Sequence, residues 1–131
     1  MAAKRVLSVG QCFADHGAIS RALGRHFAAE VVGADTAAEA LDRLRRERFD
    51  LVLVNRVGDA DGASGLDLVR AVRADAGLRA VPVMLVSNYA DAQQEAERAG
   101  AAPGFGKASL GQPHMLARVR PFLTEPDGVT G

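Results

Sequence analysis

The chain has 131 residues, of which 48% are hydrophobic, and this is the size of one domain with its own core. Sixteen basic residues balance sixteen acidic ones, so the composition excludes a global field that would favour nucleic acid or an anionic membrane. A single cysteine, together with the lack of any apolar run near the roughly 20 residues of a transmembrane helix, predicts a cytoplasmic protein without disulfides.

Two hydrophobic periodicities alternate along the chain. Short apolar runs predict five strands, at residues 5–9, 31–34, 50–55, 81–87 and 103–106. Apolar stripes of helical spacing predict five helices, at about residues 15–27, 36–44, 64–72, 91–99 and 113–123. Asp15 is in position to cap the first of these helices, and His26 falls on its buried stripe.

Strands that alternate with helices predict an α/β fold class. We expect a single doubly wound (βα)5 domain, in which a five-stranded parallel sheet of order 2-1-3-4-5 has helices on both faces. Residues 1–123 are expected to form this domain. Residues 124–131 are polar and contain Gly and Pro, so they are expected to be a flexible tail or linker stub.

Asn55 ends the third predicted strand, in the run DLVLVN at residues 50–55. In open parallel sheets, chemistry gathers just beyond the carboxyl ends of the strands, so this side chain is expected in the functional crevice. An amide there donates and accepts hydrogen bonds, but it carries no charge and is a poor nucleophile. The chemistry that the crevice can perform therefore depends on the side chains around the Asn55 amide.

Three motifs together resemble the strand signatures of response-regulator receiver domains. They are DLVLVN at 50–55, PVMLVS at 82–87 and GAAPGFGK at 100–107, and the similarity extends from about Lys4 to Leu123. In that family, two acidic residues after the first strand bind Mg²⁺ and an Asp after the third strand accepts a phosphoryl group. A Ser or Thr and a Lys contact its oxygens. The resemblance implies a bacterial two-component (phosphorelay) signalling domain, which is not an enzyme.

The site of this family is only partly present. Ser87 matches the hydroxyl position and Lys107 matches the lysine, but the acidic pair falls on Gly10 and Gln11 and the acceptor falls on Asn55. Mg²⁺ is usually held by carboxylates, and a neutral amide cannot form an acyl phosphate. The sequence predicts a degenerate receiver, or pseudo-receiver, with no bound metal or cofactor. We expect Lys107 to bond the amide oxygen of Asn55.

The switch of the family is also altered. Its aromatic position, three residues before the lysine, is Gly104, so the coupling between the hydroxyl and an aromatic ring cannot operate in its usual form. Phe105 is expected in the core, because a phenylalanine on a strand is usually buried.

Signalling by protein contact is therefore the first hypothesis. The resemblance implies an interface on the fourth helix, the fifth strand and the fifth helix, used by another signalling protein or by a second copy in a homodimer. Nucleic acid and membranes are not expected as partners. The candidate side chains on this face are Gln93, Gln94, Glu97, Arg98, Arg118 and Arg120.

Two alternatives stay open. The crevice could bind a small anion or metabolite through Lys107, Ser87 and helix N-terminal amides. A phosphorylatable receiver could use Asp59 or Asp61 as a surrogate acceptor, although Asp and Gly in this loop are typical of a solvated turn.

Cys12 is expected to be a small buried residue rather than a redox site. The sequence also lacks the phosphate loop of flavin sites and the motif of cobalamin sites.

Overall fold

A parallel five-stranded sheet forms the centre of the molecule in a computed structural model that describes residues 3–124. The order of its strands is β2-β1-β3-β4-β5, as the sequence predicts. The strands are β1 (Lys4–Val9), β2 (Ala29–Ala34), β3 (Leu51–Asn55), β4 (Val83–Val86) and β5 (Ala102–Phe105). The helices are α1 (Phe13–His26), α2 (Ala37–Arg46), α3 (Gly65–Ala74), α4 (Ala90–Arg98) and α5 (Pro113–Leu123), and a 3-10 turn, η1 (Lys107–Ser109), follows β5.

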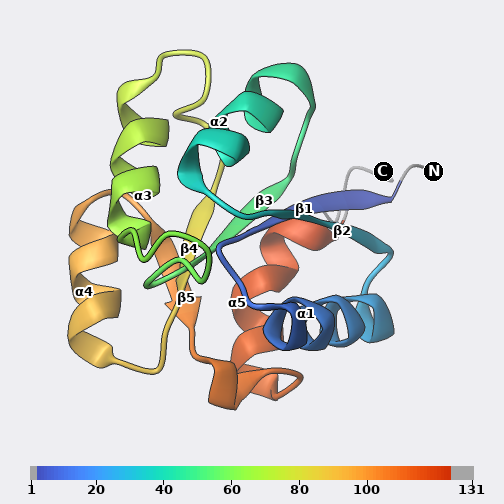
Figure 1. The fold of residues 1–131 in the computed structure, drawn as a ribbon. Coiled ribbons are helices and arrows are strands. Elements are labelled where there is room, and N and C mark those ends of the chain that lie inside the picture. The colour runs from blue at the N-terminus through green and yellow to red at the C-terminus, as the bar shows by residue number, and fades with distance from the viewer. Residues whose placement is uncertain (1–2, 125–131) are drawn as a thin grey trace.

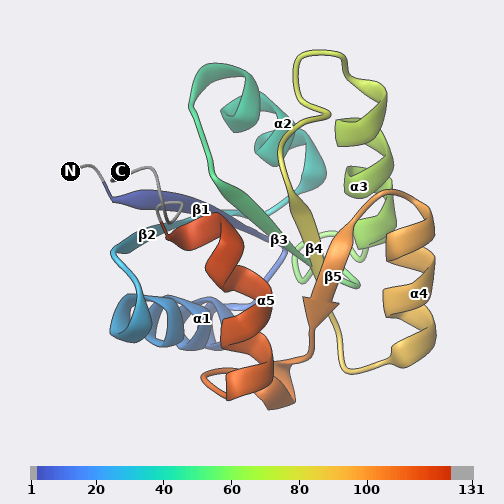
Figure 2. The ribbon, with the colours of Figure 1, turned by 180° about the vertical axis from the view of Figure 1, so that it is seen from behind.

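The helices cover both faces of the sheet (Figures 1 and 2). Helices α1 and α5 lie on one face, where Ile19 and Met115 are fully buried in a shared cluster. Helices α2, α3 and α4 lie on the other face and bury Leu44, Val69 and Ala96. Right-handed crossovers between parallel strands produce this three-layer arrangement, so the predicted doubly wound fold is confirmed.

The first helix differs from the prediction at both ends. It begins at Phe13, and its N-cap is Cys12, whose Sγ accepts a hydrogen bond from the Asp15 backbone N–H at 3.4 Å. Asp15 is therefore inside the first turn rather than the cap, and Cys12 is a partly exposed cap rather than a buried filler. His26 is exposed, not buried, because Phe27 completes the apolar stripe instead.

Several predicted boundaries shift by one to three residues, as is usual for sequence patterns. Strand β2 begins earlier than expected because Ala29 already pairs with Lys4 in the register with β1. Strand β4 is shorter than residues 81–87, and Phe105 is buried as expected. Most of the predicted tail, residues 125–131, lies outside the described residues.

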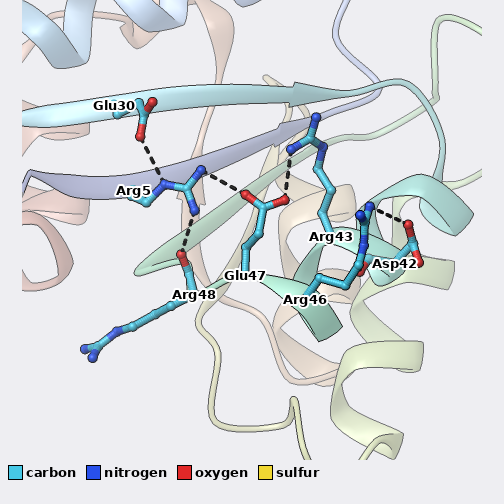
Figure 3. A network of polar contacts seen from close by, with 7 residues as sticks. All are labelled: Arg5, Glu30, Asp42, Arg43, Arg46, Glu47 and Arg48. Carbon is cyan, nitrogen blue, oxygen red and sulfur yellow. Dashed lines mark hydrogen bonds and ion pairs between the residues drawn. The ribbon is translucent and has the colours of Figure 1, made fainter.

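Arg5 holds together the edge of the sheet that lies opposite the expected crevice (Figure 3). Its guanidinium donates to the carboxylates of Glu30 and Glu47, at 3.0 Å each, and to the Arg48 carbonyl at 3.3 Å. It also lies 4.6 Å from the centroid of the Phe49 ring. The hydrogen bond from Arg5 lowers the pKa of the Glu47 carboxyl. This network joins β1, β2 and the α2–β3 loop, so we assign it a structural role.

Candidate functional site

Asn55 lies at the carboxyl edge of the sheet, defined here as the loops that follow β1, β3, β4 and β5. Its amide Nδ2 donates to the Gly10 carbonyl at 3.2 Å and to the Val57 carbonyl at 2.8 Å. Its Oδ1 accepts a hydrogen bond from the Arg56 backbone N–H at 3.1 Å. Both ends of the amide are therefore engaged in tying the end of β3 to the end of β1 and to its own loop.

Gly10 and Gln11, at the positions where the resemblance implies an acidic pair, provide no side-chain oxygen placed for a metal. Gly10 has a φ of +73°, a left-handed conformation that disfavours any side chain, and a Cβ there would lie 3.1 Å from the Gly58 Cα. Gln11 is buried, and its Oε1 has no hydrogen-bond partner among the described residues.

Mg²⁺ requires oxygen ligands that converge, but Asn55 directs its N–H donors, not its oxygen, at the Gly10 carbonyl. No cluster of three or more His, Cys, Asp or Glu side chains occurs among residues 3–124 that could hold a metal ion. The residues at this position therefore do not fit the magnesium of the resembled family.

Lys107 forms an ion pair that the sequence did not predict. Its Nζ lies 2.5 Å from Oδ2 of Asp15, and both side chains are partly buried. The hydrogen bond from Lys107 lowers the pKa of the Asp15 carboxyl, partial burial opposes this shift, and a hydrogen bond from Cys12 adds to it. The expected contact between Lys107 and Asn55 is wrong, because a carboxylate in the first turn of α1 takes the place of the missing strand-end carboxylates.

Replacing Asp15 by Asn should lower the free energy of unfolding at pH 7 by about 0.5–1 kcal/mol, the usual value for a partly exposed ion pair. Because the folded-state pKa of Asp15 is lowered, its stabilisation is present above the ordinary Asp pKa of about 4 and is lost as the pH falls through the folded-state pKa. Urea unfolding of both proteins at pH 7 and pH 3 checks this. An equal difference at the two pH values would contradict it.

Ser87 and Asn88 lie in the loop after β4 and accept hydrogen bonds there. The hydrogen bond to Asn88 joins this loop to the one after β5. The Ser87 hydroxyl is buried and accepts a hydrogen bond from the Tyr89 backbone N–H at 3.1 Å. Asn88 Oδ1 accepts from the Ala108 N–H at 3.1 Å, and it lies so close to Gly106 that a Cβ there would collide with it. Ser87 is therefore placed beside the crevice, with its oxygen already engaged in loop structure.

A pocket of about 320 Å³ opens between these loops. Two cations reach it, Arg56 and Lys107, of which the second is paired with Asp15. The full lining consists of Asn55, Arg56, Val57, Val86, Ser87, Asn88, Tyr89 and Lys107. The structure thus brings together Asn55, Ser87 and Lys107, the residues singled out in the sequence, while Gln11 lies outside the lining.

The loop of residues 55–64 has its own internal structure. Val57 pairs with Ser64 in an isolated antiparallel bridge, and Asp61 Oδ1 accepts a hydrogen bond from the Ala63 N–H at 3.0 Å. The Asp59 backbone N–H donates to the Gly10 carbonyl at 2.9 Å, while its side chain is exposed. This is a structured turn, in which neither aspartate lines the 320 Å³ pocket, while Asp61 and Asn55 both border a smaller hollow next to it.

Gly104 lies in a shift of register between β4 and β5. Met84 pairs with Ala102 but Val86 pairs with Phe105, so β5 contains one extra residue. Pro103 within this segment has no N–H to donate. A Cβ on Gly104 would lie 2.2 Å from the Leu85 carbonyl oxygen. The switch position therefore has no room for a side chain.

Gln93 completes the hydrogen bonding at this irregular pair of strands. Its Nε2 reaches the carbonyls of Leu85 at 2.9 Å, Ser87 at 3.0 Å and Phe105 at 3.4 Å. Gln93 is only partly exposed, in contrast to the prediction of an exposed interface residue. Arg118 also donates to the strand, from Nη1 to the Gly104 carbonyl at 3.3 Å.

Replacing Gln93 by Ala should lower the free energy of unfolding by about 1–3 kcal/mol, because strand carbonyls lose their donor. The adjacent Gln94 is exposed and makes no such contact, so Gln94→Ala is the matched control and should change stability by less than about 0.5 kcal/mol. Urea unfolding measures both. Equal effects of the two substitutions would show that the buried amide contributes nothing specific.

The remaining candidates for an interface are not all on one surface. Gln94, Glu97 and Arg98 are exposed on α4. Arg120 instead lies over the Phe27 ring, with 5.5 Å from its Cζ to the ring centroid, so it faces the end of α1 rather than α4 and β5. A second hollow of about 460 Å³ runs between α4, β5 and α5, and Gln94, Glu97 and Arg118 are among its lining residues.

Sequence reasoning missed two contacts of the site, the ion pair of Lys107 with Asp15 and the hydrogen bonds of Gln93 to strand carbonyls. The Asp15 and Lys107 contact joins positions 92 residues apart, and only the three-dimensional meeting of α1 with the β5–α5 loop makes it. Gln93 could have been found, because Pro103 and Gly104 in one short strand indicate a bulge that needs an outside donor.

Comparisons with known proteins agree with this architecture. No family model matches the chain. The chemotaxis protein CheY of Pseudomonas aeruginosa is 39% identical over 69 residues, which are 51% of this chain and 54%, about half, of that protein.

Solved structures match over a greater length. A response regulator from Thermotoga maritima is 26% identical, with a TM-score of 0.76 over 94% of this chain and 99% of that chain. The chemotaxis response regulator CheY4 of Vibrio cholerae is 21% identical, with a TM-score of 0.72 over 93% of this chain and 99% of that chain. In the part of the chain that is described, no helix has the length and apolar character of a membrane span. The chain therefore has the fold of response-regulator receiver domains, and Gly10, Gln11 and Asn55 occupy the three positions at which the resemblance implies carboxylates.

Proposed function

We propose that this domain is a signalling module of the two-component type that takes up no phosphoryl group and acts through protein contacts. The observation that carries the proposal is the state of Asn55. Its amide donates to two carbonyls and accepts from one N–H, so it is a structural tie at the place where the family has its acceptor. A neutral amide has no anionic oxygen to attack phosphorus.

The interaction part of the proposal rests on the α4–β5–α5 face. Gln94 and Glu97 line the second hollow and Arg98 is exposed on the same helix, a mixture of charged and polar groups that suits a reversible interface. Gln93 donates hydrogen bonds to the carbonyls of Leu85 and Ser87 and so holds α4 against the end of β4. This supports a face whose binding conformation forms without a switch. The Lys107–Asp15 pair argues against the anion-binding alternative, because the lysine already has a carboxylate partner.

Treatment with acetyl phosphate and Mg²⁺, followed by intact mass measurement, tests the first half. We expect no gain of mass, while a receiver domain with its full set of carboxylates serves as the positive control. A gain of one phosphoryl group, mapped by peptide analysis to Asp59 or Asp61, would contradict the proposal and support the surrogate-acceptor alternative.

Site-specific photo-crosslinking in the source organism tests the second half. Crosslinkers at Gln94 and Arg98 should capture the same partner, and one at Arg25, exposed on α1, should not. Identical capture from all three positions, or none from α4, would remove the support for this face.

A further inference from the structure

Large hydrophobic side chains are exposed at one edge of the molecule. Phe13 is 95% exposed, Tyr89 59% and Val57 41%, and among residues 3–124 no other large hydrophobic side chain is exposed. Each lies in a loop or first turn that follows a strand at the carboxyl edge, after β1, β4 and β3 respectively. Single exposed hydrophobic residues are ordinary, but their collection on one edge is the pattern of an interaction surface.

The same edge carries charges of both signs without partners of opposite charge. The Arg56 guanidinium is held over the Tyr89 ring, 5.0 Å from its centroid, and forms no ion pair within the described chain. Asp59 and Asp61 are exposed in the following loop, and neither pairs with a basic side chain of residues 3–124. A positive group and negative groups therefore flank the apolar side chains.

A surface with this composition is complementary to itself. In a twofold contact the same patch serves both subunits, so a cation on one copy can face an anion on the other. The chain has a formal net charge of zero, so long-range repulsion between copies is small. A partner of one charge would satisfy only one of the two signs at this edge.

We propose that two copies of this chain pair through the carboxyl edge, with Phe13, Val57 and Tyr89 at the centre of the contact. Arg56 of each copy faces Asp59 of the other. This contact is centred on the carboxyl edge and meets the α4–β5–α5 face only at Tyr89, the N-cap of α4. It does not depend on the proposed function, since loss of phosphorylation neither requires nor excludes it.

Sedimentation equilibrium of the whole chain tests the pairing, over chain concentrations from about 10 μM to 1 mM, where weak specific dimers form. We expect a monomer–dimer equilibrium. Phe13→Ser and Arg56→Glu should each weaken it by about tenfold or more, the effect of residues central to an interface. The double variant Arg56→Glu/Asp59→Arg should recover most of the affinity, because it restores opposite charges across the contact.

Variants on the other face provide the matched control. Glu97→Arg and Arg98→Glu on α4 should leave the dimerisation constant unchanged. A chain that is monomeric throughout this range overturns the proposal. A dimer that is insensitive to Phe13→Ser and Arg56→Glu, or that is lost in the α4 variants, overturns it as well.

Discussion

Replacing Gly104 by alanine should lower the free energy of unfolding by about 2–4 kcal/mol, in the range of severe overpacking. The added Cβ would meet the Leu85 carbonyl oxygen at 2.2 Å and Gln93 Oε1 at 2.8 Å. The first of these atoms is backbone in a central strand, so it cannot move aside without disturbing the sheet. Urea unfolding at pH 7, with the slope compared between proteins, measures the loss.

Gly24 provides the matched control for this substitution. It lies in α1, and a Cβ there would have no atom within 4 Å. Gly24→Ala should therefore stabilise the protein by about 0.5–1 kcal/mol, because alanine loses less backbone freedom in a helix. Unchanged stability of Gly104→Ala would mean that β5 can shift its register freely.

The same clash excludes an aromatic side chain at the position where the resemblance implies the family's switch. An aromatic side chain at position 104 would need the space that the Leu85 carbonyl and the Gln93 amide now occupy. Gly104 and Gln93 are thus sterically linked, since the glycine leaves room for the amide and the amide donates to the carbonyls of Leu85 and Phe105 in the bulged strands. The hydrogen bonds of Gln93 therefore fix this part of the α4–β5–α5 face, which supports the proposed signalling by protein contact.

The fold was predictable because the pattern of apolar residues that indicates it is periodic and repeats along the chain. Apolar runs such as residues 50–55 and stripes such as Ile19 and Leu23 each report burial directly, and five alternating units leave few possible topologies. The first helix shows where such reasoning ends. Asp15 is of a residue type that commonly caps helices, yet the structure places the Cys12 thiol at the cap, and the sequence alone gives no reason to prefer a thiol to a carboxylate.

The site was predictable in its positions but not in its contacts. The spacing of the motifs predicts that Asn55, Ser87 and Lys107 lie at the carboxyl edge of the sheet, and in the structure all three line one pocket. Which partner each side chain takes depends on distances of about an ångström between loops that are remote in sequence. Lys107 accordingly meets Asp15 rather than Asn55, and Gln93 turns inward rather than to solvent.

The contact of Lys107 with Asp15 determines the balance of charge at the crevice. The family's three carboxylate positions hold Gly10, Gln11 and Asn55, yet the lysine still has an acidic partner. Because Asp15 is supplied by α1, the ion pair ties the β5–α5 loop to that helix without needing a metal or a phosphoryl group. The partly buried lysine is therefore paired without any carboxylate at the ends of β1 and β3.

Restoring the acceptor alone, by Asn55→Asp, should fail to restore phosphorylation. The new carboxylate would have no carboxylate neighbours to hold Mg²⁺ with it, and an acid at position 10 is opposed by the left-handed backbone of Gly10. Incubation with acetyl phosphate and Mg²⁺ should leave the intact mass of the variant unchanged. A stable gain of one phosphoryl group on Asp at position 55 would contradict this view of the site.

The same substitution should cost about 2–3 kcal/mol of the free energy of unfolding. Asn55 Nδ2 donates to carbonyls at 3.2 and 2.8 Å, and a carboxylate would direct an oxygen at both of them. Asn88→Asp is the matched control: among described residues Asn88 uses only its Oδ1, toward Ala108, so stability should change by less than about 0.5 kcal/mol. A harmless Asn55→Asp would mean that the amide is not the tie between β1 and β3, and the main support for a phosphorylation-independent domain would be lost.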